Sequence, residues 1–139
     1  MIPVSRPRTV HSAVPAHPSQ ASRVRRLVAD RLRQWGAPDL LDAAVLATDE
    51  LFANAVRHAG RGRPVLIMVT VEFCCHELRV SVADPSPVLP RSRDADEGAE
   101  SGRGLAIVSA LADSWGTAPP DPGSVGKKVW FSLSAKDRL

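Results

Sequence analysis

The stretch ATDELFANAVRH, residues 47–58, carries the most informative pattern in the chain. Residues four apart share one face of a helix, so Glu50 and Asn54 point to the same side. At about 100° per residue, Arg57 and His58 fall within about a third of the circumference around them. The other positions are mostly Leu, Val, Ala and Phe, which predict packing in a core. Because a polar stripe on such a helix is costly unless it faces water, a ligand or a metal, the pattern predicts a helix that lines a cavity.

The central residues of this stripe suit a divalent cation bound together with phosphates. Mg²⁺ keeps most of its waters and takes few protein ligands, so the carboxamide oxygen of Asn54 can suffice where phosphates supply the rest. Glu50, one turn earlier, is a candidate general base close to the reacting atom.

Two helices are predicted in the N-terminal half. The longer one begins at Pro38, a favoured first-turn residue, and runs to about Ala59, with Gly60 as its C-terminal cap. A helix over 19–35 precedes it, because apolar residues recur there at helical spacing, and Gly36 supplies its stop.

Short strands surround these helices. The predicted strands are residues 10–14, 65–73, 77–83, a strand that begins at Trp115, and 128–133, the last with Val129, Phe131 and Leu133 facing inward. An irregular segment and a short helix over 105–111 separate the second and third strands from the last two. The order predicts the α+β class: a two-layer α/β sandwich with helices on one face of a mixed, mainly antiparallel sheet. We expect a flexible arm at residues 1–9 and one domain over 10–139.

Two further polar signals follow the long helix. Asp84 lies where an alternating strand ends and can accept a hydrogen bond from a ligand amine, although a turn-initiating aspartate remains the alternative. Gly102-Arg103-Gly104-Leu105 leads into the short helix, where glycines let backbone amides approach phosphates. Loop glycines before helices are common, so this turn indicates a phosphate site only in combination with the polar stripe and Asp84.

Taken together and in this order, the signals resemble the ATP-binding fold of the GHKL superfamily (gyrase, Hsp90, histidine kinases, MutL), a fold of the Bergerat type. More closely, the chain resembles the small anti-sigma regulatory factors of Gram-positive bacteria that are serine/threonine protein kinases. The matching pieces are DELFANAVRH at 49–58, VAD at 82–84, SGRGLAIV at 101–108 and GKKVWF at 126–131.

The resemblance implies roles for the polar residues of the stripe and the strand end. Asn54 corresponds to the asparagine that holds the Mg²⁺ bridging the ATP phosphates, and Glu50 to the acidic residue that acts as general base. Asp84 corresponds to the aspartate that receives the adenine amino group. Arg57 and His58 border this region, and capping or surface roles remain equally open for both.

The resemblance also implies a phosphate-binding turn formed by Gly102, Arg103, Gly104 and Leu105, whose amides meet the phosphates. Two positions depart from the family. Ser86 stands where a glycine commonly lies close to adenine, and a small serine can fit there. Lys127 stands near a usual hydroxyl residue, so it can pair with phosphate or extend into solvent.

The function implied is that of an ATP- and Mg²⁺-dependent serine/threonine kinase and anti-sigma factor. Its partners would be a sigma factor and a STAS-type anti-sigma-factor antagonist, which it phosphorylates, and the family implies a homodimer. The alternative is a non-catalytic, ATP-dependent protein-binding module. Ser86 and an acidic lid over 87–101 motivate this alternative.

The composition of the chain argues against several other classes of function. The chain has a formal charge of +3 and only 4 % aromatic residues, so stacking-based nucleic-acid binding is not expected. The early arginines indicate a solvated basic face, with an acidic partner or nucleic acid as alternatives. No apolar run approaches the roughly 18 residues of a membrane span and no signal-peptide core is present, which predicts a cytoplasmic protein. The Cys74-Cys75-His76 run reads as a turn with incidental thiols rather than a metal site.

Overall fold

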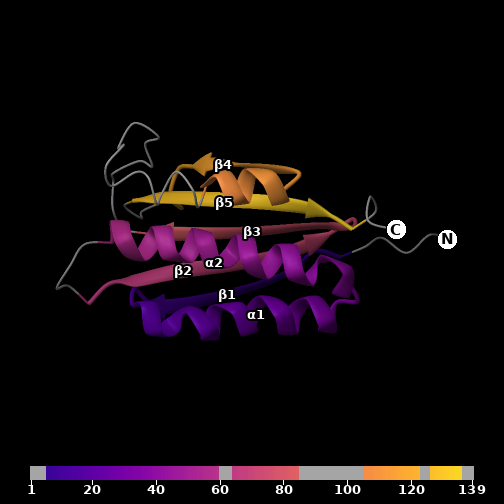
Figure 1. The fold of residues 1–139 in the computed structure, drawn as a ribbon, viewed down its shortest axis with the longest axis horizontal. Coiled ribbons are helices and arrows are strands. Elements are labelled where there is room, and N and C mark those ends of the chain that lie inside the picture. Colours follow the sequence, from indigo (N-terminus) through magenta and orange to yellow (C-terminus); the bar gives the residue numbers. More distant parts are fainter. Residues whose placement is uncertain (1–5, 60–63, 85–104, 123–125, 136–139) are drawn as a thin grey trace.

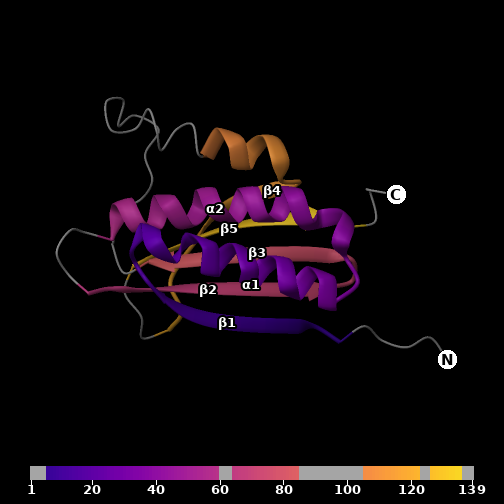
Figure 2. The same cartoon turned by 60° about the horizontal axis from the view of Figure 1, so that its bottom comes forward.

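The structure, a computed structural model, describes residues 6–59, 64–84, 105–122 and 126–135. They form a five-stranded sheet in the order β1-β2-β3-β5-β4, with α1 and α2 on one face (Figures 1 and 2). The elements are β1 (Arg8–Pro15), η1 (Pro18–Gln20), α1 (Ala21–Gln34), η2 (Pro38–Leu40), α2 (Leu41–His58), β2 (Leu66–Cys74), β3 (Glu77–Asp84), β4 (Ser114–Ala118) and β5 (Lys127–Ser134). An unlabelled helix over 105–111 precedes β4.

The predicted two-layer α+β sandwich is confirmed. Each pairing between neighbouring strands of the described sheet is antiparallel, so these strands include no parallel pair of the kind that a mixed sheet would allow. Element ends agree with the prediction or differ from it by at most three residues. The edge strand begins at Arg8, inside the predicted arm, and Pro38 opens a short 3₁₀ turn before α2. The predicted cap Gly60 and residues 1–5 of the arm lie outside the described residues.

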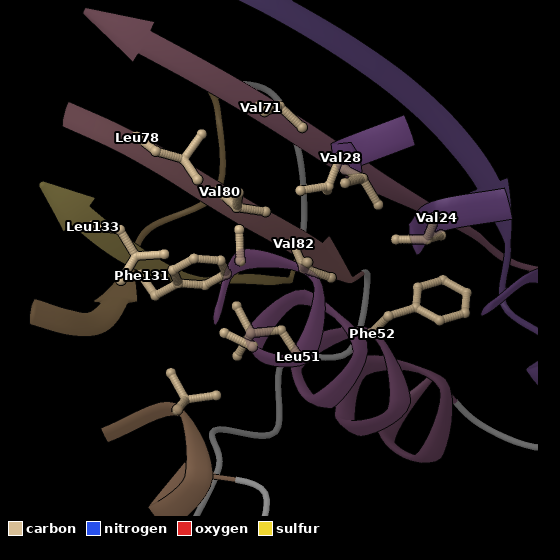
Figure 3. Close-up of a cluster of buried hydrophobic side chains, with 14 of the residues drawn as sticks. Val24, Val28, Leu51, Phe52, Val71, Leu78, Val80, Val82, Phe131 and Leu133 are labelled. Carbon is tan, nitrogen blue, oxygen red and sulfur yellow. The ribbon is translucent and has the colours of Figure 1, made fainter. Parts of the chain in front are cut away.

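The core lies between the helices and the inward-facing side chains of the sheet (Figure 3). Alternate residues of each strand point to this side because side chains in a strand alternate between its faces. The predicted inward residues Val129, Phe131 and Leu133 are all buried. Figure 3 shows Leu51 of α2 pointing toward the strands, and Phe52 on the side of Val24 from α1.

The predicted hairpin between β2 and β3 is present, with Cys75 and His76 as its two turn residues. Both have positive φ, 57° and 66°. Positive φ at both central residues is the requirement of a type I′ turn, whose twist matches that of the flanking strands. The turn therefore forms without the Asn-Gly or Gly-Gly pair that is typical of type I′ turns.

The fold brings three segments to one end of the sandwich. The C-terminal turns of α2, the end of β3 and the start of β5 lie at the end away from the labelled termini (Figure 1). The polar stripe of α2 and Asp84 consequently belong to the same end of the molecule.

Helix α1 ends as predicted at Gly36, which has φ +76°. The Gly36 amide donates to the Arg33 carbonyl at 3.3 Å, and the Ala37 amide donates to the Leu32 carbonyl at 2.8 Å. These two bonds form a Schellman motif, which needs a left-handed residue at this position.

We expect Gly36→Ala to lower the free energy of unfolding by about 1 kcal/mol, measured by urea denaturation. No atom lies within 4 Å of an added Cβ, so the cost is conformational and not steric. Gly36→Asn serves as the control, since asparagine tolerates the left-handed region, and it should cost less than alanine. Equal losses for the two variants would contradict this account of the helix end.

Candidate functional site

The polar stripe of α2 lies beside the face that packs on the sheet. Leu51 and Ala55 of this helix are buried in the core, while Glu50 is half-buried. Asn54 is only 5 % exposed. A carboxamide buried to this degree needs hydrogen-bond partners, because an unpaired polar group costs free energy away from water.

Arg57 supplies one partner of Asn54. Its guanidinium donates to Asn54 Oδ1, from one turn further along the same helix. The oxygen predicted to take Mg²⁺ therefore already attracts a cationic group. A carboxamide oxygen has two lone pairs, but two cations close together repel each other, so a metal ion at Oδ1 requires Arg57 to withdraw.

Adjacent carboxylates on α2 have different surroundings. Asp49 accepts from Arg25 of α1, with Nη1 and Oδ1 2.8 Å apart, and lies toward α1. Among the described residues, no cationic side chain pairs with Glu50. Of these two acids, Glu50 is the one with a carboxylate available to accept a proton.

Asp84 and Lys127 form a buried ion pair. Asp84 is the last residue of β3 and Lys127 the first of β5, and the two are paired directly across the sheet. Asp84 has the same strand parity as Val82, and Lys127 the same as Val129, so both side chains project to the helix-covered face. Lys127 Nζ lies 3.4 Å from Asp84 Oδ2, and neither side chain is more than 3 % exposed.

The burial of this pair contradicts one of the two predictions for Lys127 and adds detail to the prediction for Asp84. The alternative in which Lys127 extends into solvent is wrong, because the strand register turns the residue inward. Lys128, one residue later, points to the other face and pairs with the exposed Asp121 at 2.6 Å. Its hydrogen bond lowers the pKa of the Asp121 carboxyl. Asp84 does end a strand as predicted, and its carboxylate is buried instead of exposed in a turn.

Of the remaining predicted site residues, only Leu105 belongs to the described part of the chain. Leu105 begins the helix over 105–111 and packs against the core beside the buried Val108. Ser86, Gly102, Arg103, Gly104 and the lid over 87–101 lie outside the described residues, so their predicted roles stay predictions.

A cleft of about 300 Å³ lies between α1 and α2, and no sequence pattern predicted it. Its lining residues are Pro18, Ala21, Arg25, Asp49, Phe52, Ala53, Val56 and Arg57. They come from segments whose contacts are not local, so periodicity alone could not find them. Arg57 belongs both to this cleft and to the contact with Asn54.

The paired thiols do not form part of this site. Cys74 and Cys75 have Sγ atoms 3.2 Å apart at the β2–β3 turn, and this hydrogen bond raises the pKa of Cys74. Within the described ranges, no group of three His, Cys, Asp or Glu side chains is arranged to hold a metal ion.

The fold is an α+β sandwich that combines a polar helix face with a buried aspartate at the end of a strand. The family model of the histidine kinase-like ATPase domain matches residues 14–133, so the chain belongs to this family. Membership implies that the protein binds ATP.

A relative of this chain adds no function. An uncharacterized protein of Streptomyces coelicolor is 39 % identical over 69 residues, which cover 48 % of this chain and 65 % of the relative. The match thus spans less than two thirds of that protein's length. None of the described helices combines the length and apolarity needed to cross a membrane.

We expect Lys127→Met to lower the free energy of unfolding by about 3–5 kcal/mol, because it leaves Asp84 buried without its cation. The double variant Asp84→Asn/Lys127→Met removes both charges and should recover much of this loss. Lys128→Met is the matched control: its pair with Asp121 is exposed, so the change should stay below about 1 kcal/mol. Equal effects of the two single substitutions in urea denaturation would contradict the burial of the pair.

Proposed function

We propose that the protein is an ATP-dependent serine/threonine kinase that also acts as an anti-sigma factor in the cytoplasm. In this proposal it binds a sigma factor and phosphorylates an antagonist protein that competes for the same surface. The observation that carries the proposal is the stripe of α2: Glu50 and the buried Asn54 lie one turn apart on this helix, whose C-terminal turns lie at the end of the sandwich where Asp84 ends β3 (Figure 1). Membership of the histidine kinase-like ATPase family supports the nucleotide.

The residues present suit a magnesium ion held with phosphates. Asn54 Oδ1 has two lone pairs and accepts from Arg57, so it can take a metal ion once the guanidinium has withdrawn. Asn54 would hold the ion, and phosphate oxygens and water would complete its shell. When bound, Mg²⁺ supplies charge stabilisation for the phosphates.

Glu50 is the proposed general base. Its carboxylate accepts the proton of a serine hydroxyl on the antagonist while that oxygen bonds to the γ-phosphorus and the bond to the β–γ bridging oxygen breaks. The products are phosphoserine and ADP. Such transfer depends mainly on positioning and on charge stabilisation, so a base on a rigid helix suits it.

Asp84 is the proposed acceptor for the amino group of the base. Its burial at the sheet end favours a directed contact, because a carboxylate away from water interacts strongly with the few donors that reach it. The basic residues of α1 support an acidic protein partner, and the family resemblance alone supports a homodimer.

A second candidate function is a non-catalytic, ATP-dependent binding module. The Arg57–Asn54 contact favours it, because nucleotide and metal must displace a resident cation before they bind. In such a module this rearrangement would itself be the signal, with no transfer to a partner.

A thermal-shift titration tests the metal and nucleotide site. ATP with Mg²⁺ should raise the melting temperature, equivalent to about 2.7 kcal/mol at a ligand concentration of 100 Kd, and ATP without Mg²⁺ should raise it less. Asn54→Ala should abolish the part of the shift that depends on Mg²⁺. Gln34→Ala, which removes an exposed carboxamide at the end of α1, is the control and should keep the full shift. A full shift in the Asn54 variant would remove Asn54 from the site.

Phosphate transfer tests the kinase step. With labelled ATP and a cognate antagonist, Glu50→Gln should lower the rate by about a hundredfold or more, as expected for loss of a general base. Asp49→Asn is the matched control, since this neighbouring acid pairs with Arg25 and faces α1, and its rate should stay near that of the wild type. Nucleotide binding without any transfer by the wild-type protein would favour the non-catalytic module.

A further inference from the structure

We propose that Lys127 and Asp84 together recognise the base of the bound nucleotide, and that the site accepts guanine as well as adenine nucleotides. This inference rests on the proposed nucleotide site and adds its base specificity. It gives Lys127 the role of a specificity-determining residue, a role that carboxylate-only recognition of adenine does not include.

The geometry of the pair is the starting point. Lys127 and Asp84 are paired across β5 and β3 with Nζ and Oδ2 3.4 Å apart. Both point to the face that α2 covers, at the end of the sheet where the C-terminal turns of α2 lie (Figure 1). In the ion pair between Arg25 and Asp49, by contrast, both side chains are more than a third exposed.

Stability alone is a weak reason for such a pair. Removing two charges from water costs several kcal/mol per ion, and the attraction between them commonly does no more than offset this cost. Strongly buried charge pairs are for this reason candidates for functional groups. A buried carboxylate and ammonium at the proposed base site therefore call for a ligand that uses both.

Purine bases present a donor and an acceptor side by side. Adenine offers an amino N–H next to a ring nitrogen that accepts. Guanine offers a carbonyl oxygen next to a ring N–H that donates. A carboxylate alone accepts from the adenine amino group and repels the guanine carbonyl oxygen.

The ammonium of Lys127 removes this discrimination. It can donate to the ring nitrogen of adenine while Asp84 accepts from the amino group. With guanine bound, the ammonium can instead donate to the carbonyl oxygen while Asp84 accepts from the ring N–H. An ammonium has three donors, so one lysine can contact a carboxylate and a base at the same time. Lys128 cannot replace it, because it lies on the opposite face with Asp121.

Calorimetric titration of the wild-type protein with ATP, GTP and ITP in the presence of Mg²⁺ tests the inference. ITP carries the guanine-type carbonyl and ring N–H without the second amino group. We expect the dissociation constants of GTP and ITP to lie within about tenfold of that for ATP, since tenfold corresponds to one charged hydrogen bond. GTP and ITP both weaker than ATP by more than this factor would overturn the inference and leave the proposed function intact.

A variant series identifies the residue responsible. Lys127→Thr should weaken GTP by at least about tenfold more than it weakens ATP, because only the ammonium meets the guanine carbonyl. Lys128→Thr is the matched control and should leave the ratio of the two constants unchanged. Equal weakening of ATP and GTP by Lys127→Thr would mean that the lysine acts on the phosphates, which overturns the inference.

Folding and the underlying site are controlled separately. Circular dichroism and melting temperature check each variant, and if Lys127→Thr does not fold, the comparison of the three nucleotides on the wild-type protein decides alone. If a folded wild-type protein binds none of the three, the proposed function fails together with the inference.

Discussion

Leu51 and Ala55 hold α2 against the sheet, and this contact determines where the polar side chains of the helix can point. A helix is rigid over one or two turns, so once its apolar face is buried, Glu50 and Asn54 have a fixed direction. The same packing turns Asp49 toward Arg25 of α1. Two neighbouring acids thereby acquire different surroundings without any local difference in backbone.

Both oxygen-bearing groups expected to meet a nucleotide have a cationic side chain of the protein as partner. Asn54 accepts from Arg57, and Asp84 pairs with Lys127. In the proposed site, a metal ion therefore replaces Arg57 at Asn54, whereas a base adds to a carboxylate that stays paired with Lys127. Because charges in a poorly solvated environment interact strongly, both contacts favour ligands that bring comparable charge or donors of their own.

Much of the fold was predictable because its elements follow simple periodicity. The helices α1 and α2, the inward side of β5 and the end of α1 at Gly36 all appear in the sequence as local patterns. The type I′ turn at Cys75 and His76 does not appear as a local pattern. The pairing of β2 and β3 imposes positive φ on two residues that rarely adopt it. Within the site, the polar stripe and the strand-terminal Asp84 were predicted from local spacing. The burial of Lys127 depends on the register between β3 and β5, which no local signal contains.

Arg57 links the polar stripe of α2 with the cleft between α1 and α2. Its guanidinium reaches Asn54 on the polar stripe, and its side chain also lines the cleft between α1 and α2. The cleft is lined mainly by apolar residues, with Arg25 and Asp49 already paired across it. A group that enters this cleft with an acceptor of its own must therefore compete with Asn54 for the same guanidinium. Since Oδ1 of Asn54 cannot favour both a guanidinium and a metal ion at full strength, occupation of the cleft and of the proposed cation site would depend on one another through this single side chain.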